Sequence, residues 1–310
     1  MIDTLTERLE KLTDPDNIRL NEDMSAHTTF RVGGCADVFI TPANLKEATE
    51  IVRLLLTQDQ AFTVIGNGSN LIVTDSGYRG CIVCLGQGCD HIEVSGNTIT
   101  AGAGAMLAKI AKTAYDNSLT GLEFASGIPG SVGGAAVMNA GAYGGEIRDV
   151  VKQVTLFDTV TGETVKLSAD EMKFGYRRSI VKDHPYVVLE AKFELADGDS
   201  SLIKEMMDDL AAKRRDKQPL EYPSAGSTFK RPEGYFAAKL IEDAGLKGSS
   251  CGGAMVSDKH SGFVINKKDA SATDVLRLIS MIQKKVYEKF NVKLETEVVI
   301  LGDLPEEVVL

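Results

Sequence analysis

Three short segments in the second half of the sequence combine residue types that could bind a carboxylate and transfer a proton. They are FGYRRS (174–179), AGSTFKRP (225–232) and LETEVVI (294–300). An arginine can bind a carboxylate through two parallel hydrogen bonds, a serine hydroxyl beside cations is more acidic than usual, and a glutamate can hold or move a proton. A Gly-Ser turn beside Lys and Arg is more often a plain surface loop, and an acid at a strand start is more often solvated. Each segment alone therefore leaves both interpretations open.

Glycine is concentrated in three segments of the first half, each after an apolar run. The segments are IGNGSN (65–70), AGAGA (101–105) and residues 127–145, which hold 7 glycines in 19 positions. Glycine lets the backbone approach a ligand closely, and the amides of such turns bind a pyrophosphate well. The helix expected from Met106 would add its N-terminal dipole. Tight turns explain any one segment equally well, but three such segments together favour a dinucleotide site.

Two common nucleotide-binding patterns are missing. A Rossmann site needs G-x-G-x-x-G between a strand and a helix, with an acidic residue about 20 positions on. Gly102-Ala103-Gly104 lacks the third glycine, and Gly66-Asn67-Gly68 leads into a predicted strand. A Walker A loop would need Gly-Lys-Ser/Thr, which is absent. The sequence therefore predicts a dinucleotide site of another kind.

The elements that must position these segments form an α/β pattern followed by an α+β pattern. We expect helices at 1–12, 43–60, 106–115, 202–215, 235–244 and 272–290, strands at 62–65, 71–73, 81–85, 186–195, 263–265 and 295–301, and a hairpin at 151–167. Ser271 and Asp274 have capping-box spacing at the start of the last helix. Asp197-Gly198-Asp199 predicts a turn, and we place a domain boundary near residue 200.

Composition excludes several classes of protein. The 310 residues are 43% hydrophobic and 25% charged, which is ordinary for a globular protein. The net charge of −10 argues against a broad nucleic-acid surface. No stretch approaches the about 20 apolar residues of a membrane span, and the amino-terminal helix lacks the pattern of a signal peptide. The 5 cysteines form no disulfide pattern, so we expect a cytoplasmic protein with free thiols.

Three cysteines and a histidine are spaced like the ligands of a metal site. Cys81, Cys84, Cys89 and His91 have spacing similar to that of metal ligands. Cys81 and Cys84, however, belong to an apolar predicted strand, where positions three apart face opposite sides. We therefore expect no metal.

Taken in order, the motifs closely resemble those of UDP-N-acetylenolpyruvoylglucosamine reductases, flavoenzymes that make UDP-N-acetylmuramate for bacterial cell walls. The matching segments are TTFRVGG (28–34), VIGNGSNLIV (64–73), ASGIPGSVGGAAVMNAGAYGG (125–145), FGYRRS (174–179), AGSTFKRP (225–232) and LETEVVILG (294–302). The resemblance implies a two-subdomain FAD-binding unit of the vanillyl-alcohol-oxidase (PCMH) type, with subdomains at 1–90 and 91–199. It also implies an α+β substrate-binding domain at 200–294, with a carboxy-terminal strand in 295–310 that returns to the flavin.

The resemblance also implies the reaction. NADPH would give a hydride to FAD, and reduced flavin would give it to the enolpyruvyl methylene carbon, in a step of peptidoglycan synthesis that supports cell shape and cell division. The family's proton donor maps onto Ser227, and its carboxylate-stabilising pair maps onto Arg177 and Glu297. Hydride addition builds negative charge into the substrate carboxylate, so donors fixed there stabilise the transition state most.

Binding residues follow from the same resemblance. The FAD contacts would be Ile65, Gly66, Asn67, Gly68, Ser69, Asn70, Leu71, Ser126, Gly127, Ile128, Gly130, Ser131, Gly134, Asn139, Gly141 and Ala142. The substrate contacts would be Tyr176, Lys217, Lys230 and Arg231. No insertion with a lid tyrosine lies between Arg177 and residue 200, which indicates the short type of this family.

The remaining expectations concern the cofactor and its partners. None of His27, His91, His184 and His260 lies in 65–70 or 125–145, so we expect noncovalent FAD. We expect a monomer with no nucleic-acid or membrane partner. The alternatives are a flavin-dependent oxidase of the same fold acting on a small alcohol or hydroxy acid, and a non-catalytic relative that binds a UDP ligand.

Overall fold

The computed structural model describes residues 2–310, which divide into two compact units. Among the described residues, unit 1 comprises 2–20, Val38–Asn67 and Gly80–Lys213, and unit 2 comprises Asn21–Asp37, Gly68–Arg79 and Arg214–Leu310. The boundary expected near residue 200 coincides with the start of helix α5 (Ser200–Lys217), whereas the units divide after Lys213. The three-part domain division remains a prediction.

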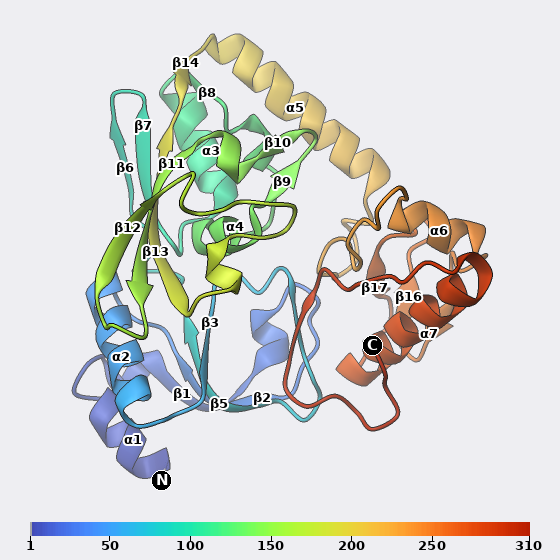
Figure 1. The fold of residues 1–310 in the computed structure, drawn as a ribbon, viewed down its shortest axis with the longest axis horizontal. Helices are drawn as coiled ribbons and strands as arrows, with labels where there is room; N and C mark the ends of the chain where they lie inside the picture. The colour runs from blue at the N-terminus through green and yellow to red at the C-terminus, as the bar shows by residue number, and fades with distance from the viewer. Residues whose placement is uncertain (1) are drawn as a thin grey trace. The chain divides into compact units, whose positions relative to one another are not determined.

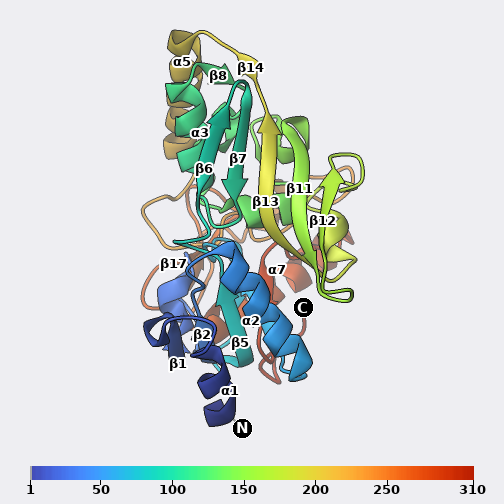
Figure 2. The same cartoon turned by 90° about the vertical axis from the view of Figure 1, so that its left-hand side faces the viewer.

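The main sheet of unit 1 is antiparallel, with the strand order β12-β11-β13-β7-β6. Its strands are β6 (Ile92–Ser95), β7 (Thr98–Gly102), β11 (Val151–Asp158), β12 (Thr164–Ser168) and β13 (Tyr186–Glu194). Helices α3 (Leu107–Asp116) and α4 (Val132–Met138) pack on one face of this sheet (Figure 1 and Figure 2). The buried residues of α3 have the spacing of a helix with one apolar face, at Leu107, Ile110, Ala111 and Ala114.

A second group of elements precedes this sheet in the chain. Helix α1 (Ile2–Leu9) and helix α2 (Leu45–Thr57) bury their apolar sides in the core of unit 1. Asn44 caps α2 by accepting a 2.9 Å hydrogen bond from the Glu47 amide. Strand β3 (Phe62–Ile65) pairs in parallel with β5 (Tyr78–Cys84) in a sheet of order β1-β2-β5-β3, whose other strands are β1 (Ile18–Asp23) and β2 (Cys35–Ile40).

Short elements connect these larger ones. The strand pairs are β8 (Leu119–Thr120) with β14 (Ala196–Asp197) and β9 (Gly141–Ala142) with β10 (Gly145–Glu146). The 3₁₀ helices are η1 (Pro15–Asn17), η2 (Met24–His27), η3 (Glu123–Ala125), η4 (Ile147–Asp149) and η5 (Ile180–Lys182).

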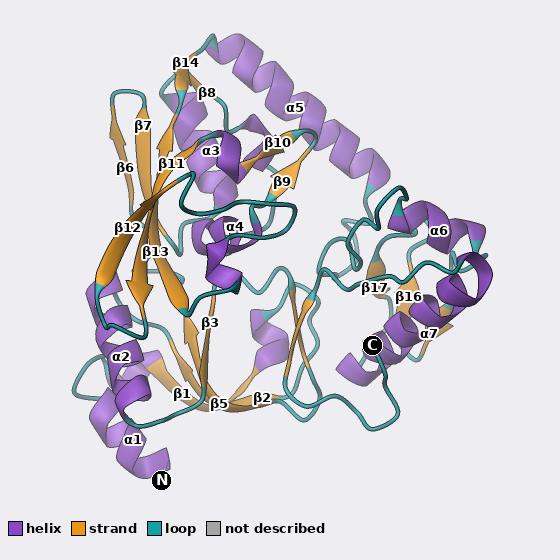
Figure 3. Ribbon diagram, in the orientation of Figure 1, coloured by secondary structure: helices purple, strands orange, loops and turns teal. Residues whose placement is uncertain are grey.

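Unit 2 is built around helix α7 (Ala272–Phe290), which packs against α6 (Ala237–Asp243) and a sheet of order β15-β16-β17 (Figure 3). These strands are β15 (Ser250–Cys251), β16 (Ala254–Val256) and β17 (Val264–Asn266). The capping box predicted for α7 is present, and the Ser271 hydroxyl accepts a 3.0 Å hydrogen bond from the Asp274 amide. The Asp75 carboxylate also accepts bonds from the first two helical amides, those of Ala272 and Thr273, at 2.9 and 2.8 Å.

The last strand of the chain pairs with a strand that follows the first glycine segment. β18 (Val299–Leu301) runs parallel to β4 (Leu71–Val73), with Val299 opposite Leu71. The last strand of unit 2 therefore lies beside the strand that directly follows residues 65–70.

The expected helices and strands are present with ends shifted by a few residues, but several elements were not expected. The glycine segment 127–145, predicted as a loop, contains helix α4 and the hairpin β9–β10. Strands β1, β2, β6 and β16 were also missed. Among the helices of residues 2–310, none is both long enough and apolar enough to cross a membrane.

Candidate active site

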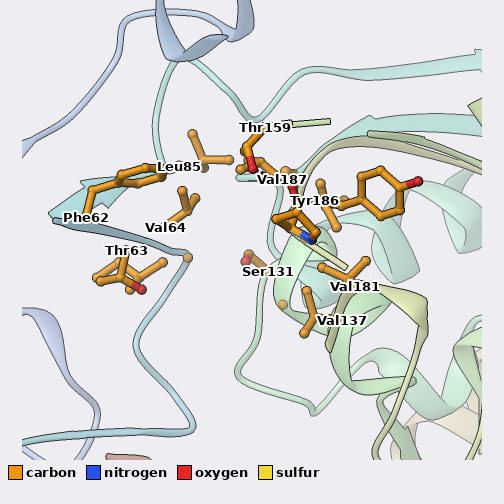
Figure 4. A pocket seen from close by; sticks show the side chains of 17 residues that line it. Phe62, Thr63, Val64, Leu85, Ser131, Val137, Thr159, Val181, Tyr186 and Val187 are labelled. Carbon is orange, nitrogen blue, oxygen red and sulfur yellow. Dashed lines mark hydrogen bonds between the residues drawn. The ribbon is translucent and has the colours of Figure 1, made fainter. Parts of the chain in front are cut away.

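Unit 1 contains a pocket of about 360 Å³. This volume is within the usual range of small-molecule sites, about 300–1,000 Å³. Strand β3 contributes Phe62 and Val64 to one side, and the segment around β13 contributes Tyr186 and Val187 to the other (Figure 4). Most of the lining is apolar. The predicted FAD contacts Ile65, Gly66, Ser131 and Gly134 all line it.

Ser131 supplies an unpaired polar group in this pocket. It occupies the N-cap of α4, yet its side chain makes no capping hydrogen bond. The residue is 3% exposed, and within residues 2–310 its hydroxyl has no hydrogen-bond partner. A buried hydroxyl without a partner is costly, so it indicates a ligand atom or water that completes the bond. Gly66 makes room for it, because a Cβ at Gly66 would lie 2.0 Å from the Ser131 Oγ.

The glycines of the three segments differ in what a side chain at their positions would contact. A Cβ at Gly134 would meet only the Ser131 Oγ, at 3.8 Å, so the space above this residue is open to the pocket. A Cβ at Gly102 or Gly104 would instead lie 2.3 Å from a backbone carbonyl oxygen. The glycines of 101–105 are therefore explained by close packing of the chain, whereas Gly134 shapes the pocket.

Backbone contacts hold the glycine segments together in unit 1. The Asn67 side-chain amide donates a 2.7 Å hydrogen bond to the Pro129 carbonyl. The Leu107 amide donates to the Gly130 carbonyl at 2.9 Å, and the Val132 amide donates to the Ala105 carbonyl at 2.8 Å. The first, second and third glycine segments thus meet around the start of α4.

The other predicted FAD contacts are distributed over both units. Gly68, Ser69, Asn70 and Leu71 belong to unit 2. Gly68 has a φ of +60°, and a Cβ there would lie 2.0 Å from the His27 carbonyl oxygen. Those in unit 1 outside the pocket lining are Asn67, Ser126, Gly127, Ile128, Gly130, Asn139, Gly141 and Ala142.

In unit 2, the segments that carry Ser227 and Glu297 lie side by side. Phe229 and Thr296 form an antiparallel bridge, and the Glu297 amide donates a 2.9 Å hydrogen bond to the Thr228 carbonyl. Ser227 is therefore the direct sequence neighbour of Thr228, whose carbonyl binds the Glu297 amide. The Glu297 carbonyl accepts a 3.0 Å bond from the Asn70 side chain, which ties this pair to the end of the first glycine segment.

Arg177 lies in unit 1, at the tip of a tight turn. Gly175 and Arg178 pair across the turn, and Arg177 has a φ of 54°, in the left-handed region. Its guanidinium carbon is 5.2 Å from the centre of the Tyr176 ring. The neighbouring Arg178 pairs instead with Asp183, at 2.7 Å.

The predicted substrate-binding cations of unit 2 have different surroundings. Lys217 is exposed at the end of α5. Lys230 forms a 2.9 Å ion pair with Glu295, and the Arg231 guanidinium carbon lies 4.8 Å from the centre of the Phe236 ring.

The cysteine group does not form a metal site within residues 2–310, where no cluster of three potential ligands occurs. Burial raises the pKa of the Cys84 thiol to about 11 and that of Cys89 to about 12. Thiols with such pKa values stay protonated at neutral pH, so neither Cys84 nor Cys89 is a reactive thiolate.

Two family models match the sequence. Residues 36–168 match an FAD binding domain, and residues 218–301 match the C-terminal domain of UDP-N-acetylenolpyruvoylglucosamine reductase. The reductase of Clostridium novyi (strain NT) is 50% identical over 302 residues, covering 97% of this chain and 98% of the relative. The chain belongs to the UDP-N-acetylenolpyruvoylglucosamine reductase family.

Other members of the family agree. The reductase of Agathobacter rectalis is 51% identical over 314 residues, covering 97% of this chain and 98% of its own. The crystal structure of the reductase from Thermus caldophilus superposes with a TM-score of 0.78 at 32% identity, covering 92% of this chain and 98% of that one. The predicted family, fold class, enzyme class and FAD cofactor are thereby confirmed.

The pocket residues outside the glycine segments were missed from the sequence. Among them, Phe62, Val64, Tyr186 and Val187 line the pocket without being predicted. Apolar strand residues look alike whether they face the core or a ligand, so no sequence signal could have found them.

Proposed function

We propose that this protein catalyses the NADPH-dependent reduction of UDP-N-acetylenolpyruvoylglucosamine to UDP-N-acetylmuramate, a step of peptidoglycan precursor synthesis. The observation that carries the proposal is the match over nearly the whole chain to reductases of that name, with Ser227 and Glu297 on adjacent segments of unit 2. A flavin oxidase of the same fold would have no need of this pair.

The pocket of unit 1 fits one end of FAD. It is apolar, it is open above Gly134, and it contains the Ser131 hydroxyl, which needs a partner. Ile65, Gly66, Ser131 and Gly134 would hold the cofactor there. When bound, the flavin supplies a carrier for the hydride between NADPH and the methylene carbon of the substrate.

Arg177 and Glu297 would act on the substrate carboxylate. Hydride addition at the methylene carbon moves negative charge into the carboxylate, and the Arg177 guanidinium can bind it through two hydrogen bonds. Glu297, carrying a proton or a tight hydrogen bond, would bind the same group. Loss of one such electrostatic group typically costs about a hundred- to a thousandfold in rate.

Ser227 would give its hydroxyl proton to the carbon next to the methylene. The residue is exposed in unit 2, where a substrate can reach its hydroxyl. Lys217, Lys230 and Arg231 carry the positive charge that a UDP group requires. We further propose that the protein acts as a cytoplasmic monomer, which size-exclusion chromatography can test.

The function can be tested in two separate half-reactions. Purified protein is first mixed with NADPH without oxygen, which should bleach the flavin. UDP-N-acetylenolpyruvoylglucosamine is then added, and it should restore the colour while UDP-N-acetylmuramate forms. A flavin that stays bleached, or that only oxygen reoxidises, would show that the proposed function is wrong.

The role of Ser227 is tested by Ser227→Ala, with Ser250→Ala as a matched control at an exposed serine of the same unit. Ser227→Ala should bleach normally with NADPH and should reoxidise with substrate at least about a hundredfold more slowly, since it loses a positioned general acid. Equal reoxidation rates in the two variants would reject the proton-donor role.

A further inference from the structure

The turn that carries Arg177 is fastened to the rest of unit 1 by two buried polar side chains. The Asn139 side-chain amide donates a 3.1 Å hydrogen bond to the Gly175 carbonyl, two residues before Arg177. The Ser179 hydroxyl, two residues after Arg177, donates a 2.9 Å bond to the Val137 carbonyl. Both side chains belong to buried residues, with Asn139 1% and Ser179 0% exposed.

The other hydrogen bonds of Asn139 fix the orientation of its side-chain amide. Its second amide donor reaches the Glu146 carboxylate at 2.9 Å, and its carbonyl oxygen accepts a 3.0 Å bond from the Arg148 amide. The residue also ends α4 with a φ of 43°, in the left-handed region that asparagine tolerates better than most residues. Its amide is thus held in one orientation, with one donor aimed at the Gly175 carbonyl.

Helix α4 connects this fastening to the cofactor pocket. Ser131, Gly134 and Val137 are spaced three residues apart, which places them on one side of the helix, and all three line the pocket. Val137 serves both ends of the connection, because its side chain lines the pocket while its carbonyl accepts the bond from Ser179 (Figure 4). A helix of this kind fixes the distance between its two ends.

We propose that Asn139 and Ser179 are positioning residues, which hold the Arg177 turn at a fixed place relative to the flavin pocket through α4. The inference rests on the proposed function, since it takes Arg177 to bind the substrate carboxylate. Asn139 then supports the arginine rather than contacting the flavin through its side chain. Without these bonds the turn loses its two side-chain hydrogen bonds to α4 and its C-cap, and the arginine is placed less precisely.

The test compares Asn139→Gly and Ser179→Ala with Asn291→Gly. Glycine keeps the left-handed backbone at residue 139 and removes only the side-chain bonds. Asn291 is the matched control, because it ends α7 in the same conformation, with a φ of 54°. Thermal melting and FAD titration of each variant show whether the fold and the pocket are intact.

We expect Asn139→Gly and Ser179→Ala to keep their FAD affinity and their bleaching by NADPH. Reoxidation by the enolpyruvyl substrate should slow by about 10- to 100-fold, the scale of a small misplacement of a catalytic group. Amide exchange at residues 174–179 should speed up, with β3 unchanged. Asn291→Gly should behave as wild type in every measurement.

A double-mutant comparison separates positioning from a general structural role. If Asn139 acts through Arg177, adding Asn139→Gly to Arg177→Ala should slow reoxidation no further. Effects that multiply in the double variant, or a loss confined to FAD binding, overturn the inference alone. A wild-type flavin that the substrate cannot reoxidise overturns the proposed function and this inference with it.

Discussion

Gly134→Ala should strengthen the fold of unit 1 and weaken its hold on FAD. Gly134 lies within α4, where alanine is favoured over glycine by about 1 kcal/mol. The new methyl group has room in the protein itself, because its nearest neighbour would be the Ser131 Oγ at 3.8 Å. For a domain of 150–250 residues, 1 kcal/mol corresponds to an increase in Tm of about 2–4 °C.

The same methyl group would occupy space that the cofactor needs. An extra methyl in a well-packed contact costs about 1–3 kcal/mol. At about 1.4 kcal/mol for each factor of ten, the Kd for FAD should rise by about 5- to 140-fold. The two effects have opposite signs, which a general loss of structure cannot produce.

Apoprotein melting and titration with FAD measure the two effects separately. Gly86→Ala is the matched control, since it makes the same change in a loop of unit 1 outside the pocket lining, where a Cβ would meet only the Cys84 Sγ at 4.0 Å. It should leave the Kd unchanged. If Gly134→Ala raises the Tm and binds FAD as tightly as wild type, the cofactor does not lie against α4.

Three further predictions concern other parts of the chain. Asp75→Asn should lower the unfolding free energy at pH 7 by about 0.3–1 kcal/mol, as loss of a negative charge at a helix N-terminus does. Burial raises the pKa of Asp75, but hydrogen bonds from Thr273 and Ala272 outweigh it and hold the pKa below 3.8. The difference in unfolding free energy between wild type and variant, measured with urea, should therefore vanish as the pH falls through the lowered pKa of Asp75. A difference that stays constant with pH would refute the role of the charge. Iodoacetamide at pH 8 should label the exposed Cys35 but neither Cys84 nor Cys89, because burial raises the pKa values of these two thiols to about 11 and 12. Equal labelling of the three cysteines in peptide mass spectra would contradict this. Acid precipitation should release all yellow colour into the supernatant, and colour retained in the pellet would indicate covalent flavin.

Local signals made much of the fold predictable. Helix α7 was predicted at its observed bounds because Ser271 and Asp274 cap it and its apolar residues recur with helical spacing. Helix α4 was not predicted, since Val132–Met138 contains adjacent glycines, which disfavour a helix. Its stability comes instead from packing against β7 and β13, which no local pattern reveals.

The candidate site shows the same division between local and distant causes. The Ser131 and Gly134 positions stand out in the sequence because the glycine-rich motif marks them. The bond from Asn139 to the Gly175 carbonyl joins residues 36 positions apart, and nothing in either segment indicates the other. The walls supplied by β3 and β13 consist of apolar residues that any buried strand could carry.

Glu297 shows how one backbone position can serve several segments of unit 2. Its amide donates to the Thr228 carbonyl, and its carbonyl accepts from the Asn70 side chain. Both backbone groups of Glu297 are therefore engaged in hydrogen bonds within unit 2. Because Thr228 directly follows Ser227 and Asn70 ends the first glycine segment, these two bonds link Glu297 both to the proposed proton donor and to that segment. The backbone bonds thus keep the two candidate catalytic groups of this unit in one register.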